Sequence, residues 1–204
     1  MTSSKSMSAA PRVVLAAVLL PAFTFNAAAA EDEPVVPMGT LAHAARALED
    51  STRGKILEIR LSDEPGDPTF EAAVKKPDGN GLVYMKIVSP TDEISAIKVS
   101  ELAPWMVSYP LEAYMRSVDK AKVPLDKAIT QAEKRADAPA VAAGVAKPLS
   151  GGNTVLAWFV ETDKGKKHEL LAIDAEYGAA ISNPEALYER RTPVKLARRL
   201  AEAP

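Results

Sequence analysis

The stretch that decides the fold runs from Gly151 to Gly178, GGNTVLAWFVETDKGKKHELLAIDAEYG. Its two apolar segments, Val155–Val160 and Leu170–Ile173, flank the polar, glycine-containing Asp163–Lys166. Short β-branched and aromatic runs on both sides of such a turn are typical of a β-hairpin. We therefore expect two antiparallel strands here, followed by a turn that closes the unit.

A helical pattern precedes the hairpin, and the same order of patterns occurs upstream. Leu125–Ala136 carries apolar residues at i, i+3, i+4 and i+7, which predicts a helix with one apolar stripe. A second such helix is expected from its N-cap Thr40 to about Asp50, and its Leu41 precedes Leu125 by 84 residues. This spacing indicates an internal repeat.

The fold predicted from these patterns is α+β, with two tandem helix-plus-antiparallel-sheet (αβββ) repeats, a connector and a C-terminal helix. Strands are expected at Lys55–Leu61, Phe70–Lys75, Leu82–Val88, Ile94–Val99, Ala138–Gly144, Val155–Val160 and Glu169–Ile173. Turns are expected at Asp63–Pro68, Pro77–Gly81, Ser89–Glu93 and Lys147–Asn153. The boundaries are a signal peptide at 1–30, a disordered lead at 31–39, repeats at 40–100 and 123–182, a connector at 101–122 and a helical tail at 183–204.

The spacing also predicts which side chains are buried. Lys55–Leu61 alternates, with Leu57 on one face and Glu58 on the other, so a half-buried strand is expected. In the last helix, Leu196 and Leu200 are expected to face inward.

The first thirty residues predict a secretory signal peptide. Lys5 and Arg12 give a positive start, Val13–Phe25 is an apolar run of thirteen, and the small residues Ala27–Ala30 predict cleavage after position 28 or 30. The alternative is a membrane anchor, but crossing about 30 Å of hydrocarbon needs roughly 20 residues. The chain has no cysteine, which excludes disulfides and lipid attachment at cysteine. We expect a periplasmic protein with no integral membrane span after signal removal.

The charge balance argues against a nucleic-acid partner. Signal removal leaves 23 basic and 27 acidic residues, a net charge of −4, whereas nucleic acids attract a basic field. One basic cluster lies in the last fifteen residues. It is interpreted either as the solvated face of a terminal helix or as a peripheral contact with an anionic membrane surface or acidic partner. Its members are Arg190, Arg191, Lys195, Arg198 and Arg199.

The sequence contains no motif for catalysis, a metal or a cofactor, so we expect a protein that is not an enzyme. His43, expected to be exposed, and His168 have no partner at metal-ligand spacing. In the closing turn, Asp174 is expected to accept backbone N–H groups two or three residues on, and Gly178 to take a positive φ. All three candidate acidic pairs fall in predicted turns, namely Asp63/Glu64, Asp92/Glu93 and Asp174/Glu176.

Aromatic side chains form the candidate binding surface, namely Trp105, Tyr109 and Trp158. The first two lie in the connector, where they either contact a partner or pack between the two repeats. Trp158 and Phe159 point to opposite faces of one strand. At least one of them is expected in the core, and the other is either covered or exposed as a binding anchor.

The order of elements resembles the PepSY domain, a small module of exported bacterial proteins. The residues that carry the resemblance are Leu41–Leu48, Gly54–Ile59, Phe70–Val74 and Pro77–Gly81 in the first unit, and Leu125–Ala136, Trp158–Asp163 and Asp174–Gly178 in the second. The first unit departs at Ser89–Glu93, which lacks the Asp and the Gly of the closing turn. The second carries Ala138 and Pro139 where a glycine follows the helix. The resemblance implies a non-catalytic regulatory module that restrains secreted peptidases or senses the envelope.

Three functional hypotheses follow. The first is an exported, non-catalytic binding or regulatory protein of the cell envelope, with a protein or peptide partner such as a peptidase. The second is a periplasmic carrier of a small molecule or lipid, with a pocket between helix and sheet. The third is a hydrolase that uses the turn carboxylates. No cofactor is expected for the first.

Overall fold

A computed structural model of the chain describes residues 39–62, 69–88, 95–107, 109–148, 155–165, 167–184, 188–189 and 193–202. All of them belong to one compact unit, Val35–Pro204. The predicted signal peptide, most of the lead, the turns Asp63–Pro68 and Ser89–Glu93, and Arg190 and Arg191 lie outside the described residues.

The helices and strands follow the predicted order. The first half holds α1 (Leu41–Thr52), β1 (Lys55–Leu61), β2 (Thr69–Lys75), β3 (Leu82–Val88) and β4 (Ser95–Leu102). The connector holds the 3-10 helix η1 (Pro104–Met106) and α2 (Tyr109–Val118). The second half holds α3 (Leu125–Ala136), β5 (Ala140–Val145), β6 (Lys147–Pro148), β7 (Ala157–Asp163), β8 (His168–Asp174), β9 (Ala180–Ile181), β10 (Tyr188–Glu189) and α5 (Pro193–Ala201). Helix α3 and strands β1 and β3 have the predicted bounds.

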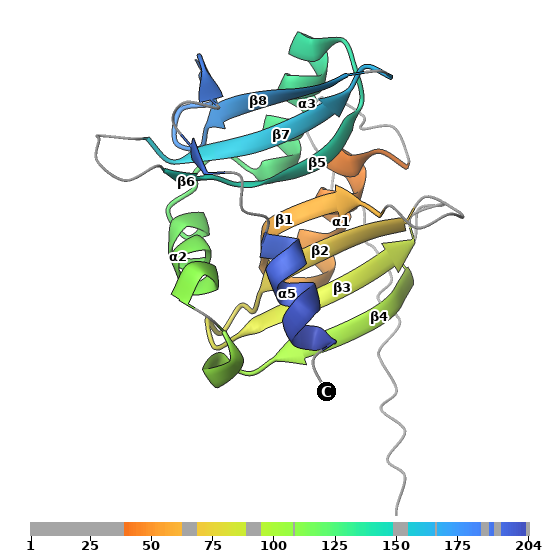
Figure 1. Cartoon of the computed structure of the whole chain (residues 1–204), viewed down its shortest axis with the longest axis vertical. Helices are drawn as coiled ribbons and strands as arrows, with labels where there is room; N and C mark the ends of the chain where they lie inside the picture. The colour runs from red at the N-terminus through yellow and green to blue at the C-terminus, as the bar shows by residue number, and fades with distance from the viewer. Residues whose placement is uncertain are drawn as a thin grey trace, which may run out of the picture. The chain divides into compact units, whose positions relative to one another are not determined.

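Eight strands form one sheet in the order β4-β3-β2-β1-β5-β7-β8-β9 (Figure 1). Every neighbouring pair is antiparallel. The α+β class is thereby confirmed. The two predicted sheets are joined into one, because β1 pairs with β5 through Glu58–Gly144, Ile59–Ala143 and Arg60–Ala142.

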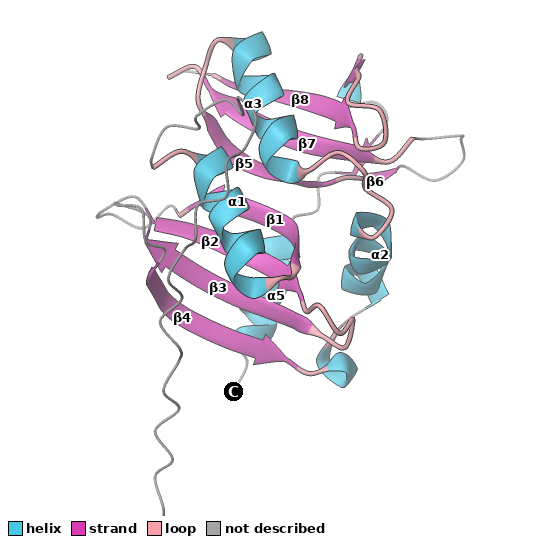
Figure 2. Cartoon of the chain, turned by 180° about the vertical axis from the view of Figure 1, so that it is seen from behind, coloured by secondary structure: helices cyan, strands magenta, loops and turns pink. Residues whose placement is uncertain are grey.

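Helices cover both faces of this sheet. Helices α1 and α3 lie together on one face (Figure 2), and α5 lies on the opposite face across β1–β4 (Figure 1). Strand β1 is therefore buried on both sides at residues 56–59 and is not the half-buried strand that was predicted. Glu58 is only 5% exposed, because α5 packs on the face that the alternating pattern assigned to solvent.

The two halves share a local arrangement at the ends of α1 and α3. Arg53 and Asp137 lie 84 residues apart and both take a left-handed φ, of 52° and 53°. The backbone N–H of each donates a hydrogen bond to the carbonyl oxygen of the residue four positions earlier. Glu49 and Glu133 each accept the backbone N–H of the residue seven positions on, at 3.2 Å and 3.0 Å. The internal repeat stays a prediction, and this shared geometry supports it.

The C-terminal tail differs from the prediction. Tyr188–Glu189 is not helical but pairs with β6, which occupies the start of the predicted turn Lys147–Asn153. On α5, Leu196 and Leu200 pack against the core as predicted, although they are only half-buried. The buried residues of this helix are Pro193, Val194 and Ala197.

Gly144 permits the close approach of β5 to β1. A Cβ atom on this residue would lie 2.7 Å from the Leu57 carbonyl oxygen and 2.9 Å from the Glu58 Cβ. Those atoms belong to β1 in the middle of the sheet, so a side chain here would have to displace the strand.

We expect Gly144→Ala to destabilise the fold by about 3 kcal/mol, the upper end of the usual effect of overpacking, because the contact is with backbone. Denaturant unfolding followed by circular dichroism measures the difference. The matched control is Gly165→Ala, which has φ of 80° but open space around it and should lose only about 1 kcal/mol. Equal stability of the two variants would contradict the close β1–β5 contact.

Candidate functional site

The structure separates the three aromatic residues of the candidate binding surface. Trp105 lies in η1 and is 84% exposed. Trp158 on β7 is 2% exposed, and its Nε1 donates to the Val123 carbonyl at 2.8 Å. Tyr109 begins α2, and its side chain lies outside the described residues. Contrary to the prediction, Trp158 cannot share an exposed surface with Trp105, because α3 and the loop before it cover that face of β7.

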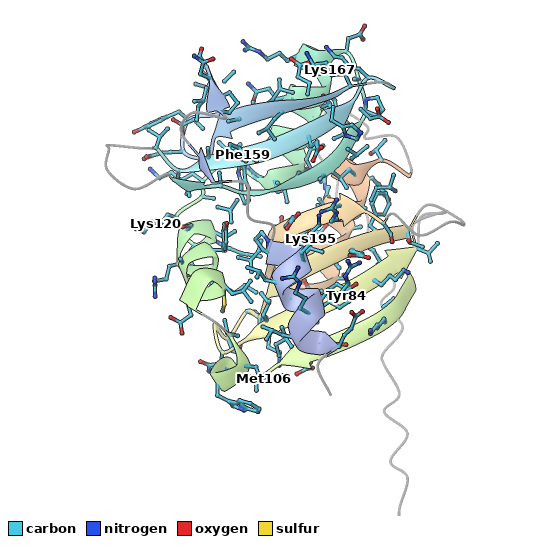
Figure 3. All side chains as sticks on the ribbon, viewed as in Figure 1. Tyr84, Met106, Lys120, Phe159, Lys167 and Lys195 are labelled. Carbon is cyan, nitrogen blue, oxygen red and sulfur yellow. The ribbon has the colours of Figure 1, made fainter. Side chains whose placement is uncertain are left out.

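Phe159 lies on the face of β7 opposite to Trp158. It is half-buried, and in Figure 3 it lies on the side of the sheet that carries α5. It packs in a small cluster with Ala146, Ala157, Ala172 and the partly buried Ile181. Of the two adjacent aromatics, Trp158 is therefore the core residue.

Trp105 stands on a well-supported turn. Pro104 occupies the first position of η1, and two backbone hydrogen bonds of 2.9 Å and 3.2 Å close the turn. Leu102 before it and Val107 after it are buried, and Met106 packs against the core. The indole is thus exposed on a segment whose two ends are fixed.

A cleft of about 350 Å³ opens where the end of α1 meets the start of α3, beside the end of α2. We call it the side cleft. Its size is at the lower end of the range for small-molecule pockets. The apolar part of its lining is Val118, Ala121, Val123, Pro124, Leu125 and Trp158, and the charged part is Glu49, Asp50, Arg53, Lys55 and Lys122.

Several charged groups of the side cleft have partners within the fold. The Lys55 ammonium donates to two carbonyls at the end of α2, both at 3.4 Å. Lys122 pairs with Glu176 at 2.5 Å. Glu49 accepts a backbone N–H from β1, and burial raises its pKa although this hydrogen bond acts in the opposite direction. These groups hold neighbouring segments together around the cleft.

The closing turn after β8 has the predicted geometry. The Asp174 Oδ1 accepts the N–H groups of Glu176 at 2.7 Å and Tyr177 at 3.0 Å, and Gly178 has φ of 74°. The carboxylate is thus engaged with the backbone. The other two acidic pairs, Asp63/Glu64 and Asp92/Glu93, lie outside the described residues.

The two histidines lie apart. His43 is not exposed as predicted but half-buried, and its Nε2 is buried with no hydrogen-bond partner among the described residues. The reason is that the buried face of α1 is wider than the predicted apolar stripe. It also includes Ala42, which lies outside that stripe. His168 is exposed, with its Nδ1 3.2 Å from Glu161. Over the part of the chain that is described, no three His, Asp or Glu side chains converge as metal ligands.

Sequence patterns missed two buried carboxylates, Glu58 and Glu71. Glu58 accepts the Val194 N–H at 2.8 Å, and Glu71 pairs with Arg198 at 3.1 Å. Arg198 of the predicted basic cluster is therefore used within the protein, while Lys195 and Arg199 are exposed. The sequence did offer one signal for these contacts, namely acidic residues within predicted strands together with a basic C-terminal helix.

None of the helices in the described segments has the length and hydropathy needed to span a membrane.

The two tryptophans should differ in fluorescence. The chain contains only two, so Trp158→Phe isolates Trp105 and Trp105→Phe isolates Trp158. Emission from Trp105 should be red-shifted and quenched by iodide several-fold more strongly than that of Trp158. As the control, both variants are unfolded in guanidinium, and the difference in emission and quenching between the two tryptophans should then vanish. Equal quenching in the folded state would contradict the two exposures.

Comparison with known proteins assigns no family. No family model matches the chain, and no curated protein matches it. A similar solved structure is the crystal structure of a "putative lipoprotein" from Clostridium difficile 630, with 14% identity and a TM-score of 0.42. The match covers 72% of this chain and 94% of that one. Such a similarity carries no argument about function, and the resemblance to the PepSY family stays a prediction.

Proposed function

We propose that this chain is an exported, non-enzymatic protein of the cell envelope that binds a protein or peptide through the surface around Trp105. The observation that carries the proposal is the 84% exposure of this indole. Tryptophan is enriched among the residues that dominate binding energy at protein interfaces.

The energetics favour Trp105 as an anchor. Covering about 200 Å² of aromatic surface contributes on the order of 5 kcal/mol, before the free energy needed to order the partner. Because η1 is closed by two hydrogen bonds and flanked by buried residues, little backbone conformational entropy remains to be lost on binding. An exposed indole on a pre-ordered backbone is suited to a pocket on a partner.

The nature of the partner is inferred from the sequence. The predicted signal peptide supports a periplasmic location, and the PepSY resemblance suggests an envelope peptidase or another envelope protein as the partner. Catalysis by Asp174 is not proposed, because its Oδ1 already holds the turn after β8.

A second candidate is the carriage of a small molecule in the side cleft. The cleft volume of about 350 Å³ and its mixed lining favour this function. Native mass spectrometry of protein purified from its own host tests it, since a bound ligand adds to the polypeptide mass. A bare polypeptide mass would argue against a carrier.

We expect Trp105→Ala to weaken partner capture at least tenfold, since an interface anchor contributes about 2 kcal/mol or more. The exported chain serves as bait in a periplasmic extract, with a scrambled-surface variant as the background. The matched control is Tyr177→Ala, which removes another aromatic that is 77% exposed and lies in the second half.

Two results would count against the proposal. If the wild-type bait retains nothing above background, the protein does not act by stable binding. If it retains a partner and Trp105→Ala retains the same amount, binding uses a different surface.

A further inference from the structure

Helix α5 is fixed to the sheet by two buried carboxylates. At its start, the Val194 N–H donates to Glu58 Oε2 at 2.8 Å. One turn later, Arg198 Nη1 donates to Glu71 Oε1 at 3.1 Å and approaches Oε2 at 3.4 Å. Between these points the helix buries Val194 and Ala197 against the sheet.

Glu58 lies in a confined position. It is 5% exposed, and its neighbour on β5 is Gly144, which has no side chain to contact it. The charged groups around it come from three elements: Arg60 of β1, whose Nη1 is 4.0 Å from Oε1, Lys195 of α5 and Glu161 of β7. In Figure 3, Lys195 projects from α5 on the side of the sheet where Glu58 is covered.

An ionised carboxylate is poorly hydrated in such a place. Burial raises the pKa of Glu58 to about 7, while the Val194 N–H, Arg60 and Lys195 act to lower it and Glu161 adds to the rise. When α5 leaves the sheet, water reaches the carboxyl group and removes the desolvation, which is the largest cause of the shift. The pKa then falls toward the ordinary value of 4.5, even though the Val194 N–H and Lys195, which lower it, move away with the helix. The docked helix therefore binds the Glu58 proton more tightly than the open one.

We propose that α5 is a pH-responsive strap, which holds the face of β1–β4 closed in mild acid and opens more often as the pH rises toward neutrality. This inference is independent of the function proposed for Trp105. The closed strap covers Glu71 and Tyr84, which are 3% and 2% exposed, so opening would give a partner access to this face.

The direction follows from the linkage of protonation and docking. A carboxyl whose pKa is raised in the docked state stabilises docking while it is protonated. That stabilisation is complete below about pH 4.5 and is lost progressively as the pH rises to about 7, above which it stays constant. The ion pair of Glu71 with Arg198 and the apolar contacts of Ala197 remain as the other attachments.

Opening can be measured as the rate at which a thiol reagent reaches Ala197→Cys in a chain that has no cysteine of its own. Ala197 lies on the face of α5 that packs on the sheet, and it is fully buried. Exposed Arg199→Cys, on the same helix, corrects for the ionisation of the thiol. Ala132→Cys, fully buried on α3, reports global unfolding.

The corrected rate at Ala197→Cys should rise on the order of 100-fold from pH 5 to pH 8, because each unit of pKa difference changes the opening equilibrium tenfold. Glu58→Gln, which keeps an oxygen to accept the Val194 N–H, should reduce this rise to less than threefold. The rate at Ala132→Cys should change far less.

The proposal is overturned if the corrected rate at Ala197→Cys does not rise with pH, or if it rises in parallel with that at Ala132→Cys. A full pH dependence in the Glu58→Gln background would also overturn it. Amide hydrogen exchange of α5 in the unmodified chain, corrected for the intrinsic pH dependence, tests the same opening if Glu58→Gln fails to fold. Unchanged α5 protection between pH 5 and pH 8 would then refute it.

Discussion

The pairing of β1 with β5 is the contact on which the rest of the structure depends. Only three residue pairs make this connection, yet it turns the strands of two halves into one sheet of eight. Helices α1 and α3 pack against each other over it (Figure 2), so their contact requires the correct strand register. Gly144 occupies the point of closest approach. A side chain there would push apart the strands and, with them, the two helices that complete the core.

The same junction explains why a carboxyl group can lie in the middle of the sheet. Glu58 is placed on the central strand, where helices cover both faces, and burial of an unpaired charge would be strongly unfavourable. The first turn of α5 offers unpaired N–H groups, and its Val194 N–H gives the Glu58 carboxyl a hydrogen-bond donor. This bond offsets only part of the desolvation, which still raises the pKa of Glu58. Glu71 on the next strand receives Arg198 from the same helix. Two acidic residues of the first half thus fix where α5 packs on the sheet, although Glu58 and Val194 lie 136 residues apart in the sequence.

Local periodicity was sufficient where the bounds of an element or the geometry of a turn depend on neighbouring residues in the chain. Helix α3, strands β1 and β3, and the turn at Asp174 follow from spacing and turn chemistry, because the groups that fix them lie a few residues apart. The failures involve remote contacts. Glu58 alternates like a surface residue, and only α5 covers it. Trp158 and Trp105 have the same side chain, but Trp158 is buried because α3 and the loop before it cover its face of β7, where the Val123 carbonyl, 35 residues away, accepts its N–H. No pattern in either segment contains that information.

The two candidate functions can be compared by asking which residues of each site the stability of the fold already accounts for. The polar groups of the side cleft join α1, α2 and β1, so much of its composition follows from holding the fold together. Trp105 is different, because an indole that is 84% exposed gives the folded chain little of the stabilisation that a tryptophan supplies when buried. A small polar residue could occupy that position on η1 with less exposed apolar surface. A requirement outside the isolated fold accounts for the tryptophan better than stability does, and a partner that covers the indole is the simplest such requirement.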